Sequence, residues 1–283
     1  MICFHMHCFV FALLIVGLVQ TECSLRLGSF SVPNLGKETV DNPAFMDTIA
    51  KICERYDLIV LHVKGDMFFK DFRKFLKPVR RGRIRKYVYI LSEPRGRSSV
   101  KGQYILIFRG EAFVVEDFKN FPDPNGHFER TPLHFLSFGR LRYSGKFPNF
   151  AVITVQLNSN DLLAEMDWLY EEVEAYRKHS RMENVLVVGD MNLDCSPEFL
   201  KDGDAFKFQK DQSYYWLVPN NLEKYPSQNA CAYNRMIGYG DALSKAIGFN
   251  KTTAYRFDVD LHLTNEQAKS ISDFYPTEFT FEL

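Results

Sequence analysis

Short segments that contain only apolar residues constrain the fold of this chain more than any other feature. Residues 58–61 (LIVL) and 185–188 (VLVV) carry no polar side chain. A strand with one face in water alternates apolar and polar residues, so an unbroken apolar run indicates a strand that is covered on both faces. The pattern therefore predicts an α/β chain, in which two packed β-sheets have helices outside them.

Helical segments alternate with such strands along the chain. Asn42 followed by Pro43 is typical of a helix start, and it predicts a helix whose apolar face includes Phe45, Ile49 and Cys53. Further helices are expected over residues 67–76 and 161–177, and further strands over residues 87–91, 104–108, 112–115, 150–157 and 278–281. No repeat or linker interrupts the series, so residues 25–283 are expected to form one domain.

The first 24 residues have the composition of a secretory leader. An apolar run over residues 9–19 has the length of a signal-peptide core and is shorter than the ~20 residues that span a bilayer. The segment before it lacks Lys and Arg, which leaves an uncleaved signal anchor as the alternative. We predict a signal peptide over residues 1–24 and a secreted, extracellular protein with no transmembrane span in its mature chain.

Removal of the leader changes the number of cysteines that can pair. The chain has 6 Cys, of which Cys53, Cys195 and Cys231 follow the leader. An odd number in a secreted protein indicates one disulfide with a buried free thiol, or an intermolecular link. Cys53 lies on the apolar face of its predicted helix, so we expect it to be the buried thiol. Asn250 begins an N-x-T tripeptide, which is a candidate glycosylation site.

Charge is balanced in total and uneven in its distribution. The chain has 35 Lys+Arg against 35 Asp+Glu, and its 46% of hydrophobic residues excludes disorder along the whole length. Residues 70–86 nevertheless hold nine basic side chains and one acidic side chain. The nine are Lys70, Arg73, Lys74, Lys77, Arg80, Arg81, Arg83, Arg85 and Lys86. This basic stretch predicts binding to a polyanion such as DNA, a sulfated glycan or an anionic surface, and the alternative is a solvated helix face.

Six short motifs lie along the chain after the leader. They are residues 25–30 (LRLGSF), 56–58 (YDL), 92–97 (SEPRGR), 189–192 (GDMN), 231–233 (CAY) and 271–276 (ISDFYP). In this order and spacing they resemble deoxyribonuclease I, of the endonuclease/exonuclease/phosphatase superfamily, over residues 25–283. The resemblance implies a four-layered α/β sandwich, in which two mixed sheets are flanked by helices. It also implies a disulfide between Cys195 and Cys231.

The same resemblance locates positions at which this sequence departs from the family. Members hydrolyse a phosphodiester with divalent metal ions, two histidines and several acidic residues. The corresponding positions here are Ser31 for an Asn, Val63 and Gly102 for two Glu, Gln156 and Phe274 for the two His, and Asn234 for an Asp. The matching residues that survive are Asp190, Asn192, Asp273 and Arg130, and the resemblance implies that Arg130 contacts phosphate.

These replacements remove the groups on which the family's chemistry depends. A proton-transfer group contributes ~10²–10⁴ in rate, and a divalent metal polarises the phosphoryl oxygen. Valine and glycine side chains cannot ligate a metal, and a glutamine amide is not a proton-transfer group. His62 cannot take over from Val63, because the two-residue period of a strand turns its side chain to the other face. We therefore predict a pseudoenzyme that acts by binding and needs no cofactor.

Two alternatives remain open. The first is residual metal-dependent phosphodiesterase or endonuclease activity that uses Asp190, Asn192 and Asp273 with Mg²⁺ or Ca²⁺. The second follows from the resemblance, because some members of the family bind actin on the strand that precedes the SEP motif. Tyr89 and Leu91 lie on that strand here, and burial of both in the sheet is an equal explanation.

Overall fold

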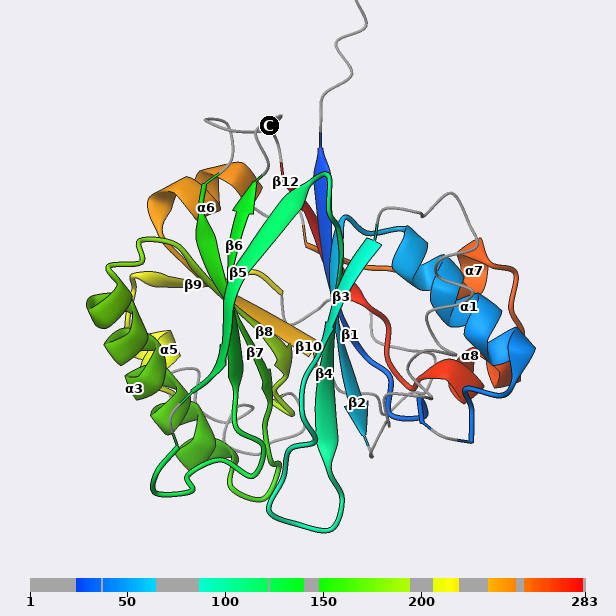
Figure 1. The fold of residues 1–283 in the computed structure, drawn as a ribbon, viewed down its shortest axis with the longest axis horizontal. Coiled ribbons are helices and arrows are strands. Elements are labelled where there is room, and N and C mark those ends of the chain that lie inside the picture. Colours follow the sequence, from blue (N-terminus) through cyan, green and yellow to red (C-terminus); the bar gives the residue numbers. More distant parts are fainter. Residues whose placement is uncertain are drawn as a thin grey trace, which may run out of the picture.

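Two six-stranded β-sheets lie face to face in the computed structural model, with helices over both outer faces (Figure 1). The structure describes residues 24–36, 38–64, 87–121, 123–139, 148–193, 206–218, 234–247 and 252–281. Residues 1–23 of the predicted leader, the expected helix over residues 67–76, the basic stretch, Cys195, Cys231 and Asn250 lie outside the described residues. The four layers confirm the predicted fold class.

The first sheet has the strand order β11-β12-β1-β2-β4-β3. Its strands are β1 (Leu25–Ser31), β2 (Leu58–Lys64), β3 (Tyr87–Leu91), β4 (Gly102–Arg109), β11 (Thr253–Ala254) and β12 (Thr277–Phe281). β1 and β2 run parallel, and every other neighbouring pair in this sheet is antiparallel. The sheet is therefore mixed, as predicted.

The second sheet has the strand order β5-β6-β7-β8-β10-β9. Its strands are β5 (Phe113–Asn120), β6 (Leu133–Gly139), β7 (Phe150–Gln156), β8 (Val185–Asp190), β9 (Tyr214–Trp216) and β10 (Asn234–Tyr239). One parallel pair, β7 with β8, lies among antiparallel neighbours. α3 connects these two parallel strands along the chain, as a parallel crossover requires.

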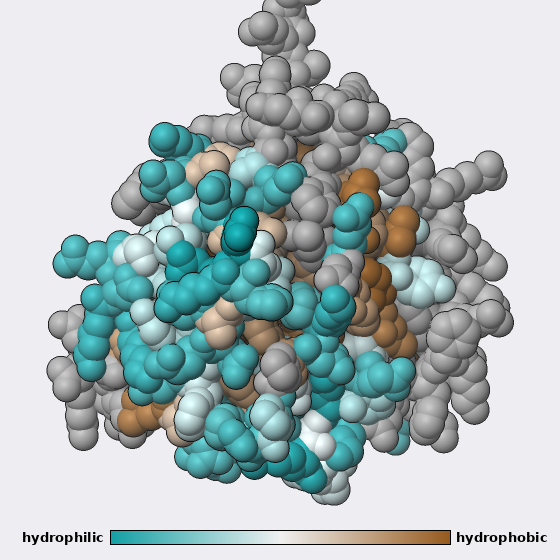
Figure 2. All heavy atoms as spheres, turned by 60° about the vertical axis from the view of Figure 1, so that its left-hand side comes forward, coloured by the Kyte–Doolittle hydropathy of each residue, from teal (hydrophilic) through white to brown (hydrophobic). Residues whose placement is uncertain are grey.

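Helices cover the outer face of each sheet (Figure 1). The first sheet is covered by α1 (Pro43–Glu54), α7 (Phe257–Asp260) and α8 (Asn265–Ile271). The second sheet is covered by α3 (Leu162–Ser180) and α5 (Lys207–Lys210), and α6 (Asp241–Ile247) lies at one end of the sandwich. Seen with the α3 side turned forward, the surface is mainly hydrophilic, as expected of an outer helical layer that faces water (Figure 2).

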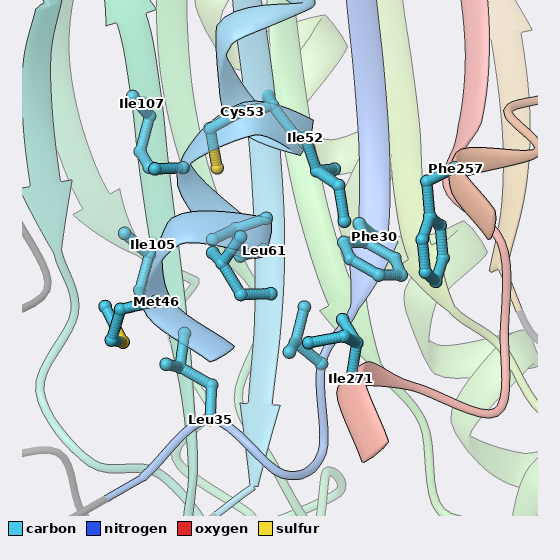
Figure 3. Packing of buried hydrophobic residues seen from close by; sticks show 14 of the residues in the cluster. Phe30, Leu35, Met46, Ile52, Cys53, Leu61, Ile105, Ile107, Phe257 and Ile271 are labelled. Atoms are coloured by element: carbon cyan, nitrogen blue, oxygen red, sulfur yellow. The ribbon is translucent and has the colours of Figure 1, made fainter. Parts of the chain in front are cut away.

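The buried apolar residues form three layers that match this arrangement. A first helix-side core joins α1 and α8 to the first sheet and includes Phe30, Ile52 and Leu61 (Figure 3). An inter-sheet core includes Leu27, Val60, Phe135 and Val188, and a second helix-side core joins α3 to the second sheet. Successive residues of β2 thus face the two cores in turn. Both faces of the strand are buried, and for this reason its apolar run is unbroken.

Several local predictions are confirmed by the structure. All of residues 58–61 and 185–188 are buried, and β3 has the predicted bounds. The Asn42 side chain accepts hydrogen bonds from Ala44 N at 3.0 Å and Phe45 N at 3.2 Å, so it caps α1. α3 begins at Leu162 and its Asp161 makes no side-chain cap bond. Strands β1, β6, β9, β10 and β11 had no counterpart among the predicted strands.

Cys53 is a buried free thiol, as predicted (Figure 3). It lies in the first helix-side core with an exposed fraction of 1%. Burial raises the pKa of this thiol strongly, because the thiolate would lose its hydration. Cys53 is thus an apolar packing group in the folded chain. Among the described residues, no helix has both the length and the apolar character to cross a membrane.

Gly28 brings two of the sequence motifs into contact. It lies in β1, and the Tyr56 ring from the YDL motif occupies the space into which a side chain at position 28 would project. A Cβ at Gly28 would lie 2.5 Å from Tyr56 Cε1, while a Cβ at Gly36 would have no heavy atom within 4 Å. Tyr56 is fully buried, so the ring has little room to move away.

We predict that Gly28→Ala lowers the free energy of unfolding by about 1–3 kcal/mol, because the added methyl group overpacks the Tyr56 contact. Gly36→Ala is the matched control, and its free energy of unfolding should stay within about 0.5 kcal/mol of the parent. Chemical denaturation of both variants measures the difference. Equal stabilities of the two variants would contradict the packing described for Gly28.

Candidate functional site

Polar residues from both sheets meet at the end of the sandwich where β2, β7 and β8 end and β4 begins. In the second sheet Gln156, Asp190 and Asn234 are direct neighbours on β7, β8 and β10. From the first sheet, Ser31 Oγ donates a hydrogen bond to Asn234 Oδ1 at 2.9 Å. All four side chains are at least 95% buried. The structure therefore brings together four positions that the family resemblance links to the catalytic site.

Asp190 is the only carboxylate among these four residues. Its exposed fraction is 5%, and its Oδ1 atom has no hydrogen-bond partner among the described residues. Burial raises the pKa of the Asp190 carboxyl to about 6, and the charges of Lys64 and Arg130 oppose this rise. A backbone hydrogen bond from Asn192 also lowers the pKa of this carboxyl, because it favours the charged form.

Neighbouring side chains occupy the space that a side chain at position 102 would fill. A Cβ at this position would collide with Gln156 Oε1 and would lie 2.8 Å from Arg130 Cδ. The Arg130 side chain therefore lies against the start of β4, and its Nη2 donates to Val100 O at 3.3 Å. The space beside Gly102, where the family has a Glu, is filled by an amide and a guanidinium group.

Val63 and His62 face opposite sides of the first sheet, as predicted. Val63 is fully buried in the first helix-side core, so it does not join Asp190. His62 faces the second sheet, and its Nε2 lies 2.8 Å from Thr154 Oγ1. Burial lowers the pKa of His62 to about 3. His62 is therefore a neutral core residue that links the two sheets.

Asp273 and Asn192, which also match the family pattern, have surroundings that differ from those of Asp190. Asp273 is exposed, and Phe274 beside it is half-buried. Ser272 Oγ donates to Ser31 O at 2.7 Å and accepts from Phe274 N at 3.0 Å, which fixes this turn against β1. Asn192 has a positive φ of 49°, and its Nδ2 donates to Leu157 O at 2.7 Å. Its amide thus holds the ends of β7 and β8 together.

A divalent metal ion does not fit this set of donors. Hard cations require several oxygen ligands, and carboxylates supply most of them. Here Asp190 is joined by amides and a hydroxyl, and Asp273 is exposed. Within the described part of the chain, no group of three or more His, Cys, Asp or Glu side chains could hold a metal. The donor set therefore favours hydrogen bonding over metal ligation.

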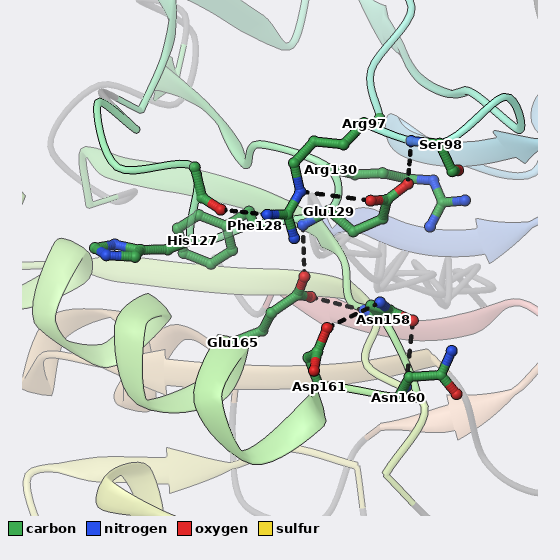
Figure 4. A network of polar contacts seen from close by, with 12 residues as sticks. Arg97, Ser98, His127, Phe128, Glu129, Arg130, Asn158, Asn160, Asp161 and Glu165 are labelled. Carbon is green, nitrogen blue, oxygen red and sulfur yellow. Dashed lines mark hydrogen bonds and ion pairs between the residues drawn. The ribbon is translucent and has the colours of Figure 1, made fainter.

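Glu165 supports the loop that carries Arg130 (Figure 4), and no motif or local pattern around Glu165 predicted this role. Its two carboxylate oxygens accept from Glu129 N at 2.6 Å and from Asn158 N at 2.7 Å. The Glu129 carboxylate in turn accepts from Ser98 N at 3.0 Å and pairs with Arg97. Glu165 is fully buried, and burial raises its pKa to about 6. One carboxylate thus joins α3 to two loops at the end of the sandwich.

Known proteins with similar sequences are nucleases. Deoxyribonuclease-1 of Bos taurus is 27% identical over 273 residues, which cover 95% of this chain and 96% of that protein. Deoxyribonuclease-1-like 2 of Homo sapiens is 26% identical over 276 residues, which cover 92% of each chain. No family model matches the chain.

Solved structures with a similar fold come from the endonuclease/exonuclease/phosphatase proteins. One from Bacteroides thetaiotaomicron has a TM-score of 0.62 at 12% identity and covers 91% of this chain and 97% of that chain. D. rerio TDP2, solved with a single-strand DNA product, has a TM-score of 0.59 at 13% identity and covers 92% and 100%. These likenesses establish the fold of the present chain.

The raised pKa values of Asp190 and Glu165 predict a pH-dependent stability. Both groups bind a proton more tightly in the folded state than in the unfolded chain, where their values are about 3.8 and 4.5. The free energy of unfolding should therefore fall as the pH rises from about 4 to above 6, by roughly 2–3 kcal/mol per group. Asp190→Asn and Glu165→Gln should each reduce this slope.

Urea denaturation at a series of pH values measures the effect. Asp273→Asn is the control, because this carboxyl is exposed and its removal should leave the slope unchanged. If the Asp190→Asn and Glu165→Gln variants keep the slope of the parent, the burial of these two carboxyls does not govern the pH dependence.

Proposed function

Because the chain is a homologue of deoxyribonuclease I with the endonuclease/exonuclease/phosphatase fold, we propose that it is a secreted member of this family that binds DNA without hydrolysing it. The observation that carries this proposal is the composition of the site around Asp190. Six positions at which the family has metal-binding or proton-transfer groups hold Ser31, Val63, Gly102, Gln156, Asn234 and Phe274. The predicted signal peptide supports secretion, and Cys195–Cys231 pairing and glycosylation at Asn250 belong to the same proposal.

The absence of hydrolysis follows from the chemistry of these side chains. Hydrolysis of a phosphodiester needs an activated water, a proton for the leaving oxygen and stabilisation of the developing charge. The Gln156 amide and the Phe274 ring can neither accept nor donate a proton in this way. The contributions of catalytic groups are not additive, so the loss of one already removes most of the rate.

Binding is supported by the cations that surround the same end of the sandwich. Arg95, Arg97 and Lys101 lie on the connection between β3 and β4, and Arg130 lies beside it on the loop after β5. The Arg97 side chain is 55% exposed. The basic stretch of residues 70–86 joins β2 to β3 in the sequence. Positive side chains close to each other bind the phosphate backbone of DNA by releasing its counterions.

We predict that the purified chain does not nick plasmid DNA in the presence of Mg²⁺ and Ca²⁺. Gel electrophoresis of supercoiled plasmid measures nicking, and Asp190→Ala is the control. Nicking of equal strength by the chain and by this variant identifies a contaminating nuclease. Nicking by the chain that the Asp190→Ala change abolishes would contradict the proposal and would favour residual hydrolysis with Asp190.

We also predict retention on a DNA resin through the basic stretch. Replacement of Arg80, Arg81, Arg83 and Arg85 by Ala should lower the salt concentration of elution, because fewer counterions are released. A control with the same charge change replaces Lys51, Lys178, Lys245 and Lys269, which lie on described helices. Equal elution of the two variants refutes a role of the basic stretch. Retention on heparin resin alone would identify a sulfated glycan as the partner in place of DNA.

A further inference from the structure

An exposed tryptophan lies on the outer face of α3. Trp168 belongs to none of the three cores that the described residues form, and its exposed fraction is 40%. Tryptophan is mostly buried in folded proteins, so this exposure is unusual. Exposed aromatic side chains of this size often supply much of the binding energy of protein interfaces. Trp168 therefore marks a candidate interaction surface.

The Trp168 ring is supported from one side. The His127 imidazole stacks on it, with 3.6 Å between the ring centroids and 3° between the ring planes. His127 lies beside α3 on the loop between β5 and β6 (Figure 4). The Asp123 carboxylate fixes this loop, because it accepts from His127 N at 2.6 Å and from Phe128 N at 3.2 Å. One face of the indole is thus covered, and its exposed area belongs to the opposite face and the ring edge.

Acidic side chains lie around the exposed indole. Glu171 and Glu172 follow Trp168 by three and four residues, so they lie beside it on the same face of α3. Lys207 pairs with Glu171 at 2.9 Å, whereas no hydrogen bond or ion pair reaches the Glu172 carboxylate from the described part of the chain. The stacked pair, Glu171, Glu172 and Asp123 are called the Trp168 patch below. Its three carboxylates exceed the single ammonium group of Lys207, so the patch carries negative charge.

The open indole face and the carboxylates favour the same chemical group. The face of an aromatic ring attracts cations, and a guanidinium group can stack on the ring while it pairs with a carboxylate. The chain itself forms this combination elsewhere. The guanidinium carbon of Arg55 lies 4.2 Å from the centre of the Tyr255 ring, and Arg55 Nη2 pairs with Glu278 at 2.7 Å. The Trp168 patch offers an aromatic face and a carboxylate in the same way, on the surface of the molecule.

We propose that the Trp168 patch binds an arginine-bearing segment of a partner protein. The guanidinium group stacks on the open face of Trp168 and pairs with the Glu172 carboxylate. His127 holds the indole in place from the other side, so little side-chain entropy is lost on binding. The interaction surface lies on α3 and does not depend on the proposed DNA binding.

Tryptophan fluorescence tests whether the contact is made at Trp168. The chain has 2 Trp, so Trp216→Phe leaves Trp168 as the only one. The probe is a peptide with blocked ends in which three arginines alternate with glycines, and it is added to the full mature chain. The emission of Trp168 should change and reach saturation. The same peptide with citrulline in place of arginine keeps the shape without the charge, and it should cause no change.

Isothermal titration calorimetry with the arginine peptide compares variants of the full mature chain. Trp168→Ala should weaken binding about fivefold, and Glu172→Gln about threefold. Glu183→Gln is the matched control, because Glu183 is exposed and lies outside the Trp168 patch, and its affinity should equal that of the parent. Thermal unfolding shows whether each variant is folded.

Three outcomes overturn the inference. They are no binding of the arginine peptide to the parent, equal affinities for the arginine and citrulline peptides, and parental affinity of a folded Trp168→Ala variant. None of them affects the proposed DNA binding, which is measured separately on the DNA resin.

Discussion

Burial of the inter-sheet core is the constraint on which the rest of this structure depends. Each sheet offers one apolar face to the other and the opposite face to helices, so the central strands are covered on both sides. Two sheets that pack in this way align the ends of their strands. Residues at those ends, such as Ser31 and Asn234, are therefore brought within hydrogen-bond distance, although they are far apart in the sequence.

Polar bridges between the sheets depend on this packing and on the exclusion of water. His62 and Thr154 meet inside the sandwich, and burial keeps the imidazole neutral. Asp190 lies buried at the end of the same layer, where the charges of Lys64 and Arg130 act on it. The same geometry that would concentrate acidic ligands around a metal here surrounds one acid with amides, a hydroxyl and two cations. The fold is thus shared with the solved structures, while the side chains at this end of the sandwich are specific to the present chain.

Glu165 shows how a buried charge can organise the surface above it. Its two oxygens accept backbone N–H groups from two different loops. Hydrogen bonds of this kind offset part of the cost of burying a carboxylate. The Arg97–Glu129 pair and Arg130 depend on the position of one of these loops. The side of the molecule that carries Arg97 and Arg130 is thus held in position from inside the protein.

The sequence by itself determined the layered fold, the capped start of α1 and the burial of Cys53. Each of these follows from a local pattern or from a residue type at a matched position. The short strands β9 and β11 lacked such a pattern. Only the tertiary structure decided that Lys64, Arg130 and Asp190 lie together. Strand register and sheet packing join residues that are distant in the chain, and no local pattern encodes that distance.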